Sequence, residues 1–457
     1  MKILGFALLS SFLFVPLAEA ELSEKVFEKV LPNGLKVLLL ENDRAPVISF
    51  QVWYRVGSRN EEVGRTGLSH LLEHMMFKGT KKVGPKDFSR IVQENGGRSN
   101  AFTSYDYTAY VETLTADRIQ VALDLESDRM QNLVLREDSF QTERKVVIEE
   151  RRLRTEDNPK AYLMEQLLAT AFQRQPYRWP IVGWMQDLER LRLDDVRSYY
   201  RTYYNPGNAF VVAVGDFKKE DLILRIEKAF GPIPKEDPPN QDRNIDPLQS
   251  GERTIIVKRE AMLPFIINAF HVPNFDEPDS FVLEVIATLL SRGRGSRLYG
   301  SLVREKRLAL HTEADHSLLS RDPGLFVISV ELLPGQKIDH VEDAVDQELE
   351  RLRREPVGDE ELAKAKTQLE AAFTFGQDSL FYQGMLLAQY EIAGNWRQID
   401  DYLPAIQRIT SKDIQRVANR YLVRDNRTVG ILIPLPLREG GRPPEEFSIK
   451  EKMVNYR

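Results

Sequence analysis

The spacing of apolar residues predicts both strands and helices in each half of the chain. Pro32-Asn33-Gly34 predicts a turn between the first two strands. Period-two alternation or short apolar runs predict strands at 26–30, 36–40, 47–56, 99–102, 108–114, 254–257 and 325–331. Helical periodicity fills 117–134, 139–154 and 162–172, and another helix is expected after the glycines of 64–67. This mixture predicts an α+β fold.

A pattern near the middle of the chain returns close to its end. Residues 195–204 form a predicted helix with an acidic first turn, followed by Asn208 and an apolar strand. Residues 413–422, Asn426 and another apolar strand repeat this order without a gap. Helix, turn and strand can recur by chance in mixed proteins, but the coincidence of Asp, Tyr, Asn and strand favours a duplication.

The repeat divides the chain into two homologous mixed α/β sandwich domains. Residues 236–252 are rich in proline and charge, which is typical of an extended linker. We therefore expect an N-terminal domain at 21–235 and a homologous C-terminal domain at 253–437, each a sheet flanked by helices. Residues 438–457 show no clear periodicity and are expected to form a surface tail. The length also favours two cores over one.

The first residues resemble an export signal. Met1-Lys2 precedes an apolar run at 3–17, and Ala18-Glu19-Ala20 places small residues before a cleavage site. A membrane anchor is the weaker reading, because a span needs about 20 apolar residues. With no cysteine in the chain, lipid attachment at a cysteine is excluded. We expect a signal peptide at 1–20 and a secreted, most simply periplasmic, protein without a membrane anchor.

Composition adds little beyond one exclusion. The formal net charge is −6 at pH 7. Mild acidity gives no support for nucleic-acid binding, which usually needs a basic surface.

His70-Leu71-Leu72-Glu73-His74 is the strongest candidate for chemistry. Residues four apart project from one face of a helix, so His70 and His74 can bind one metal ion. Glu73 lies on the same side, where it can accept a proton from an attacking water. The order reverses the commoner H-E-x-x-H motif. The alternative is an amphipathic helix whose histidines only partner buried polar groups, although the chain has just six histidines.

A third ligand must come from elsewhere, and the acidic segment 143–150 is the better source. The four other histidines lie in the second half without metal-ligand spacing. Glu143 and Glu150 are seven residues apart and share one helical face, whereas Glu149 points away from it. If this helix packs on the motif helix, Glu150 can bind the metal and Glu143 can line the site. Acidic helical runs are usually solvated, so the spacing leaves both readings open.

The chain resembles the pitrilysin-type (inverzincin, M16) zinc metallopeptidases, in the short two-domain branch with mitochondrial processing peptidase and bacterial periplasmic zinc proteases. The resemblance rests on motifs at 31–35, 67–80, 96–103, 143–150 and 176–183. It implies one Zn²⁺ per chain, with Glu150 as the third ligand after His70 and His74. It also implies catalytic roles for Glu73 and Glu143. Substrate peptide would add as an extra strand along Asn100, Ala101, Phe102 and Thr103.

One departure from the family pattern concerns the second half. Relatives carry an Arg and a Tyr seven residues apart that contact substrate. This chain has Arg304, but His311 stands at the tyrosine position. Either His311 replaces the tyrosine as a donor, or a homologous partner supplies the Arg/Tyr pair. We favour the partner, and so expect a dimer, possibly a heterodimer, that closes as a clamshell over peptides or unfolded segments.

The resulting hypothesis is a zinc endopeptidase, with Arg304 and His311 as further substrate-binding candidates. A non-catalytic scaffold or peptide-binding subunit is the alternative, although the retention of Glu73 with all three ligands argues against it. A purely structural zinc site is disfavoured, because such sites usually close with four protein ligands, often cysteines.

Overall fold

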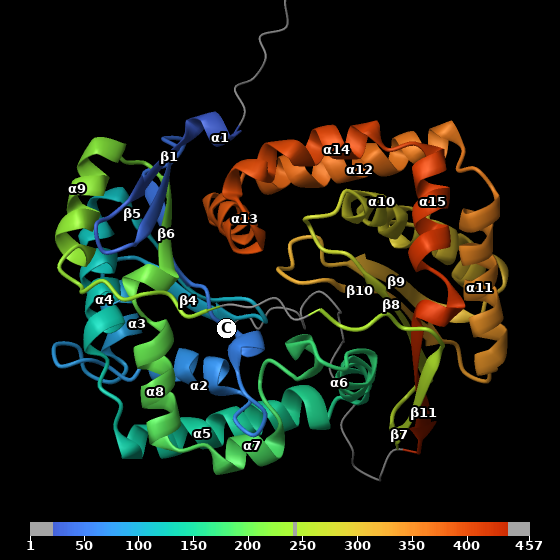
Figure 1. The fold of residues 1–457 in the computed structure, drawn as a ribbon, viewed down its shortest axis with the longest axis horizontal. Helices are drawn as coiled ribbons and strands as arrows, with labels where there is room; N and C mark the ends of the chain where they lie inside the picture. The colour runs from blue at the N-terminus through green and yellow to red at the C-terminus, as the bar shows by residue number, and fades with distance from the viewer. Residues whose placement is uncertain (1–21, 241–244, 437–457) are drawn as a thin grey trace, which may run out of the picture.

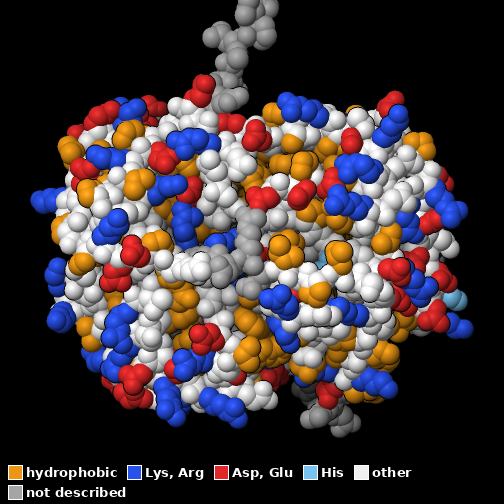
Figure 2. Space-filling view, viewed as in Figure 1, with side chains coloured by type: hydrophobic (Ala, Val, Ile, Leu, Met, Phe, Trp, Pro, Cys, Tyr) orange, Lys and Arg blue, Asp and Glu red, His pale blue; other side chains and the backbone are white. Residues whose placement is uncertain are grey.

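The computed structural model describes residues 22–240 and 245–436. The signal peptide predicted at 1–20 and the tail predicted at 438–457 lie outside these described residues. Within them, no helix has the length and apolar character needed to cross a bilayer. Basic and acidic side chains are interspersed over the face shown in Figure 2.

A six-stranded sheet forms the core of the first half, in the order β1-β2-β6-β3-β5-β4. β2 and β6 are parallel, and the other neighbouring pairs are antiparallel. The strands are β1 (Val26–Val30), β2 (Lys36–Glu41), β3 (Val47–Tyr54), β4 (Arg98–Thr103), β5 (Thr108–Thr115) and β6 (Ala209–Gly215). The helices of this half are α1 (Leu22–Lys25), α2 (Leu68–Met75), α3 (Asp87–Glu94), α4 (Ile119–Asn132), α5 (Glu137–Arg151), α6 (Pro159–Ala171), α7 (Met185–Arg190), α8 (Leu193–Tyr203) and α9 (Lys219–Phe230).

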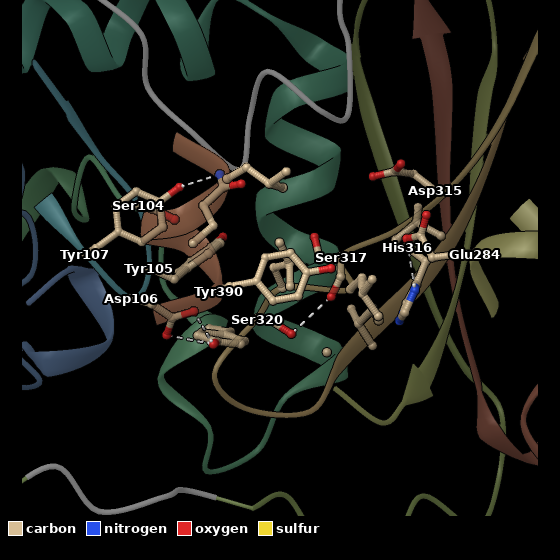
Figure 3. Close-up of a pocket in the computed structure, with 18 of the residues that line it drawn as sticks. Ser104, Tyr105, Asp106, Tyr107, Glu284, Asp315, His316, Ser317, Ser320 and Tyr390 are labelled. Carbon is tan, nitrogen blue, oxygen red and sulfur yellow. Dashed lines mark hydrogen bonds and ion pairs between the residues drawn. The ribbon is translucent and has the colours of Figure 1, made fainter. Parts of the chain in front are cut away.

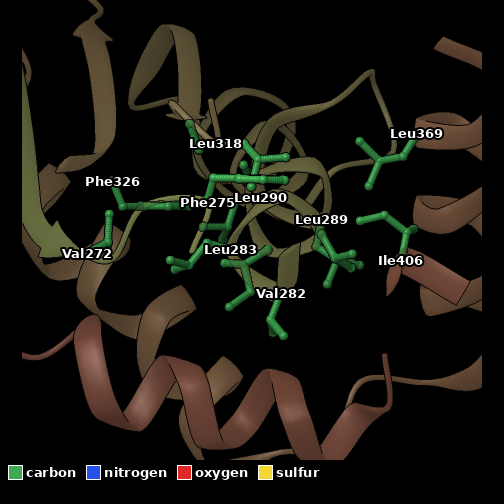
Figure 4. Packing of buried hydrophobic residues seen from close by; sticks show 14 of the residues in the cluster. Val272, Phe275, Val282, Leu283, Leu289, Leu290, Leu318, Phe326, Leu369 and Ile406 are labelled. Carbon is green, nitrogen blue, oxygen red and sulfur yellow. The ribbon is translucent and has the colours of Figure 1, made fainter. Parts of the chain in front are cut away.

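A five-stranded sheet forms the core of the second half, in the order β7-β11-β8-β10-β9. Its strands are β7 (Arg253–Glu260), β8 (Phe265–Val272), β9 (Ala309–His316), β10 (Gly324–Leu332) and β11 (Arg427–Leu435). Its helices are α10 (Asp279–Ser291), α11 (Ile338–Arg354), α12 (Asp359–Gly376), α13 (Leu380–Ala393), α14 (Tyr402–Arg408) and α15 (Ser411–Tyr421). Figure 4 shows part of its apolar packing, where Leu283 and Leu290 of α10 lie near Phe275 and Phe326.

The two sheets share one topology. Taken in chain order, β2 to β6 occupy the same relative places in their sheet as β7 to β11 in theirs. The parallel pair β2–β6 corresponds to the parallel pair β7–β11. The repeated segments are α8 with β6 and α15 with β11. The duplicated α+β architecture is therefore confirmed, whereas the residue limits of the two domains remain a prediction.

Helix α6 belongs to the first half of the chain but covers the second sheet. Leu163 and Leu167 of α6 are buried against β11, as Figure 1 shows beside β7 and β11. Gly430 of β11 permits this approach, because a Cβ there would lie 3.0 Å from Leu167 Cδ1. The sequence analysis did not foresee this contact.

Helix α13 makes the reciprocal contact, from the second half onto the first sheet. Gln51 of β3 donates a hydrogen bond of 3.1 Å to the carbonyl of Phe381. Apolar side chains of α13 share one cluster with Trp53, Phe102 and Phe210 of the first sheet. β6 is consequently apolar on both faces, since one faces α13 and the other faces the helices of its own half. The halves thus complete each other's cores.

We expect Leu167→Ala to lower the free energy of unfolding by about 2–5 kcal/mol, the usual cost of a large core truncation. Because α6 links the two sheets, both halves should still unfold in one transition. Chemical denaturation followed by the fluorescence of Trp53 in the first half and Trp396 in the second measures both effects, using single-tryptophan variants. Leu224→Ala is the matched control, because Leu224 is 62% exposed. Equal costs for the two variants, or two separate transitions, would contradict this packing.

Candidate metal centre

The motif helix α2 begins where the sequence predicts, directly after Gly67. Gly67 has φ +88°, a left-handed conformation that favours glycine. The Glu61 carboxylate accepts hydrogen bonds of 2.7 Å from both the Gly67 and the Ser69 backbone N–H groups. These hydrogen bonds satisfy donors that the first helical turn leaves open, while burial raises the pKa of Glu61 to about 8. Every residue of α2 is buried.

His70, His74 and Glu150 bring three donor atoms together. The Nε2 atoms of His70 and His74 lie 3.7 and 3.4 Å from the same oxygen, Glu150 Oε2. These residues form the one group of candidate metal ligands found in the described part of the chain. Ligands about 2.1 Å from a tetrahedral zinc ion are separated by about 3.4 Å. Two imidazoles and one carboxylate at these separations therefore fit Zn²⁺ and leave a fourth position for a non-protein ligand.

Helix α5 supplies both acidic groups, as its seven-residue spacing suggested. Glu143 Oε2 lies 3.1 Å from His74 Nδ1, and Glu143 Oε1 lies 2.5 Å from Lys78 Nζ. The far ring nitrogen of a metal-ligating histidine is commonly held by a carboxylate in this way. Glu149 instead points to solvent beside Arg152.

Neighbouring charges keep both carboxylates of α5 ionised. Burial by itself would raise the pKa of Glu150, but His74, His70 and Arg154 outweigh it and lower that pKa to about 2. Arg154 Nη1 lies 3.0 Å from the Glu150 oxygen that faces away from the histidines. Burial also raises the pKa of Glu143, but the hydrogen bonds with His74 and Lys78 outweigh it. The pKa of Glu143 therefore lies below its ordinary value. An ionised carboxylate is the form that binds a metal.

Glu73 joins the ligand cluster to the edge of the first sheet. It is fully buried, and its Oε2 accepts a hydrogen bond of 2.6 Å from Thr103 Oγ1. Thr103 ends β4, the last strand in the sheet order. Ala101 also packs in the cluster on the α2 side, whereas Phe102 packs on the α13 side against Trp53. A polypeptide could add to this strand edge directly beside Glu73.

The chain is similar to known proteins over most of its length. Residues 36–183 match the sequence model of the insulinase family (peptidase family M16), and residues 190–369 match that of the peptidase M16 inactive domain. The chain is 33% identical over 439 residues to "Zinc protease PqqE" of Helicobacter pylori, covering 93% of this chain and 98% of that protein. The chain belongs to the M16 peptidase family.

Other M16 proteins extend the likeness. A probable mitochondrial-processing peptidase subunit beta of Arabidopsis thaliana is 26% identical over 89% of this chain and 78% of its own length. The crystal structure of a protease from Helicobacter pylori superposes with a TM-score of 0.86 at 32% identity, covering 90% of this chain and 99% of that one. An M16 inactive domain from Pseudomonas fluorescens, at 19% identity, covers 92% of this chain and all of that one, has a TM-score of 0.78 and shares the fold.

Arg304 and His311, the two substrate-binding candidates of the second half, lie outside the group of candidate metal ligands. Arg304 belongs to a π-helical turn at Tyr299–Glu305 and is exposed, with Glu305 as its ion-pair partner at 3.5 Å. His311 is an exposed residue of β9. Neither is a member of the metal-ligand group.

The sequence analysis missed the residues that support the ligands. Lys78 lies four residues after His74 and Arg154 lies four residues after Glu150, so helical spacing could have revealed both. No local signal marks Glu61, whose role depends on the path of the loop before α2. Thr103 was expected to bind substrate, and the structure adds its hydrogen bond to Glu73.

Replacing Glu150 by Gln should weaken zinc binding by more than about 100-fold, because losing a ligand costs more than losing a group that supports one. Glu149→Gln is the matched control, because the Glu149 side chain is 61% exposed and points away from the site. Zinc affinity of the metal-free variants can be measured by competition with a chromophoric chelator. Equal affinities for the two variants would exclude Glu150 as a ligand.

Proposed function

We propose that the protein is a zinc endopeptidase that hydrolyses peptides or unfolded segments, with one zinc ion per chain. The observation that carries this proposal is the position of Glu73. Its carboxylate lies between the ligand group of His70, His74 and Glu150 and the edge strand β4, to which the hydrogen bond from Thr103 joins it. A proton acceptor thus stands where a metal site and a peptide-binding edge meet. The zinc proteases among its relatives support the same chemistry.

The residues divide the work of amide hydrolysis. Zinc, when bound, supplies a water of lowered pKa and polarises the scissile carbonyl. Glu73 accepts the proton of the attacking water and delivers it to the leaving amine. The hydrogen bond from Thr103 to one Glu73 oxygen fixes the orientation of this carboxylate. Glu143, held by Lys78, keeps the ring of His74 in its orientation.

A non-catalytic peptide-binding subunit is the alternative function. The match of residues 190–369 to the M16 inactive domain shows that such sequences occur in this family. In this chain, however, the complete ligand group and Glu73 lie in the first half, outside that match. Their joint presence favours catalysis.

We further propose that the active form is a dimer, in which a homologous subunit supplies an Arg/Tyr pair. The exposure of Arg304 and His311 supports this, because both are available to another chain rather than directed into their own core. The pattern of residues 1–20 supports export, most simply to the periplasm.

Glu73→Gln should reduce kcat/KM for an unfolded peptide by about 10²–10⁴-fold, the usual contribution of a general base. Zinc content, measured by metal analysis, should remain at one per chain, because Glu73 is not a ligand. Glu62→Gln provides a control at an exposed glutamate. Undiminished cleavage by the zinc-loaded Glu73 variant would refute the general-base role. No cleavage by wild type, alone or with a partner, would favour the non-catalytic alternative.

The partner proposal predicts that the lone chain is weakly active and that a homologous M16 chain without the zinc motif raises its kcat/KM. Complex formation can be followed by light scattering in the same samples. Full activity of a monomer would defeat this part of the proposal without touching the role of Glu73.

A further inference from the structure

A cavity of about 450 Å³ lies between the two halves of the molecule. Figure 3 shows Tyr105 and Tyr107, from the loop after β4, facing Tyr390 of α13 and the loop after β9. The remaining wall is mostly aromatic or aliphatic and comes from α6, α10, α12, α13 and α14 and from strands β9 and β10. Pockets of 300–1,000 Å³ with such walls, at domain interfaces, are typical ligand sites.

The cavity begins one residue away from the catalytic machinery. Thr103 holds Glu73, and the next residue, Ser104, lines the cavity. A strand rises about 3.3 Å per residue. A peptide that adds to β4 therefore passes from Glu73 to the cavity within two or three of its own residues.

The cavity also lies between the edge strands of the two sheets. β4 and β9 are the last strands of their sheets, and the cavity is lined by the residues that follow each, including Tyr105 and Ser317. A peptide extending from the edge of β4 toward the second half must cross it. Strand residues alternate between faces. Because Phe102 packs on the α13 side and Thr103 on the α2 side, alternate side chains of an added peptide point toward the α13 side, where the cavity lies.

Two acidic groups of the wall, Asp106 and Glu284, have partners of their own. Asp106 accepts a hydrogen bond of 2.7 Å from Tyr177 and lies 3.4 Å from Arg59 Nε. Glu284 lies 3.4 Å from His316 Nδ1. Arg292 and Asp315 also line the cavity, and most of the other lining side chains are aromatic or aliphatic.

We propose that this cavity is a specificity pocket for a large apolar or aromatic side chain of the substrate, two or three residues from the bond that is cleaved. The inference rests on the proposed peptidase function and adds to it a class of substrate. Burying such a side chain supplies binding energy, whereas a small or charged one leaves the aromatic wall unfilled.

Filling the cavity tests the proposal. Ala372 of α12 lines it, whereas its neighbour Ala371 does not. Ala372→Trp should reduce kcat/KM at least about 10-fold for peptides with a large apolar residue at the selected position. Peptides with a small residue there should be cleaved as by wild type. Ala371→Trp is the matched control. Leu168→Trp fills the cavity from α6, so that one cavity-filling variant remains if the other fails to fold. Cleavage of a degenerate peptide library, read by mass spectrometry, reports the preferences.

Binding separates this inference from the peptidase proposal. Fluorescence anisotropy of labelled peptides on zinc-loaded Glu73→Gln protein should show tighter binding of aromatic than of alanine-substituted peptides, and Ala372→Trp should remove the difference. Binding with this preference but without cleavage by wild type would refute the peptidase and retain the pocket. Unchanged preferences in both filled variants, or a loss confined to Arg and Lys peptides, would overturn the pocket.

Discussion

His74 and Glu73 have no exposed surface, so their polar atoms need hydrogen-bond partners within the protein in place of water. The contact between α2 and α5 supplies Glu143 to His74, and β4 supplies Thr103 to Glu73. Lys78 and Arg154 then bring positive charge to the two carboxylates of α5. Each partner fixes a side chain in one orientation. The metal centre is consequently preorganised by the same contacts that make its burial tolerable.

These contacts extend from the candidate metal ligands to the junction of the two halves. Arg151, next to Glu150, is buried and donates hydrogen bonds of 2.8 Å to the Gly183 carbonyl and to Glu165 of α6. Gly183 in turn lies against Gly67 at the start of α2, where a Cβ on Gly183 would approach Gly67 Cα to 2.6 Å. The ligand helices α2 and α5 and the exchanged helix α6 are therefore joined through one small set of contacts.

Much of the site was predictable because its residues lie close together in the sequence at helical spacing. His70, Glu73 and His74 follow from one helical turn, and the pairing of Glu143 with Glu150 follows from two. The duplication could be read from the repeat that became α8 with β6 and α15 with β11. The exchange of α6 and α13 could not be predicted, because the sequence of an amphipathic helix does not indicate which sheet the helix will cover. The cavity was equally invisible, since its walls meet only after that exchange. The helix predicted at 139–154 ends earlier, at Arg151, where a π-helical turn at Arg152–Glu156 follows.

The exchanged helices also set the order in which this chain can fold. A ribosome releases the zinc-bearing half first, while the helix that covers its sheet, α13, comes only at residues 380–393. Until then α13 cannot pack over Trp53, Phe102 and Phe210. Helix α6 likewise cannot pack on β11 before that strand, which ends at Leu435, has been made. Exposed apolar surface of this kind makes a partly synthesised chain prone to aggregation. The N-terminal half carries every candidate metal ligand, but one face of its sheet stays uncovered until α13 is made.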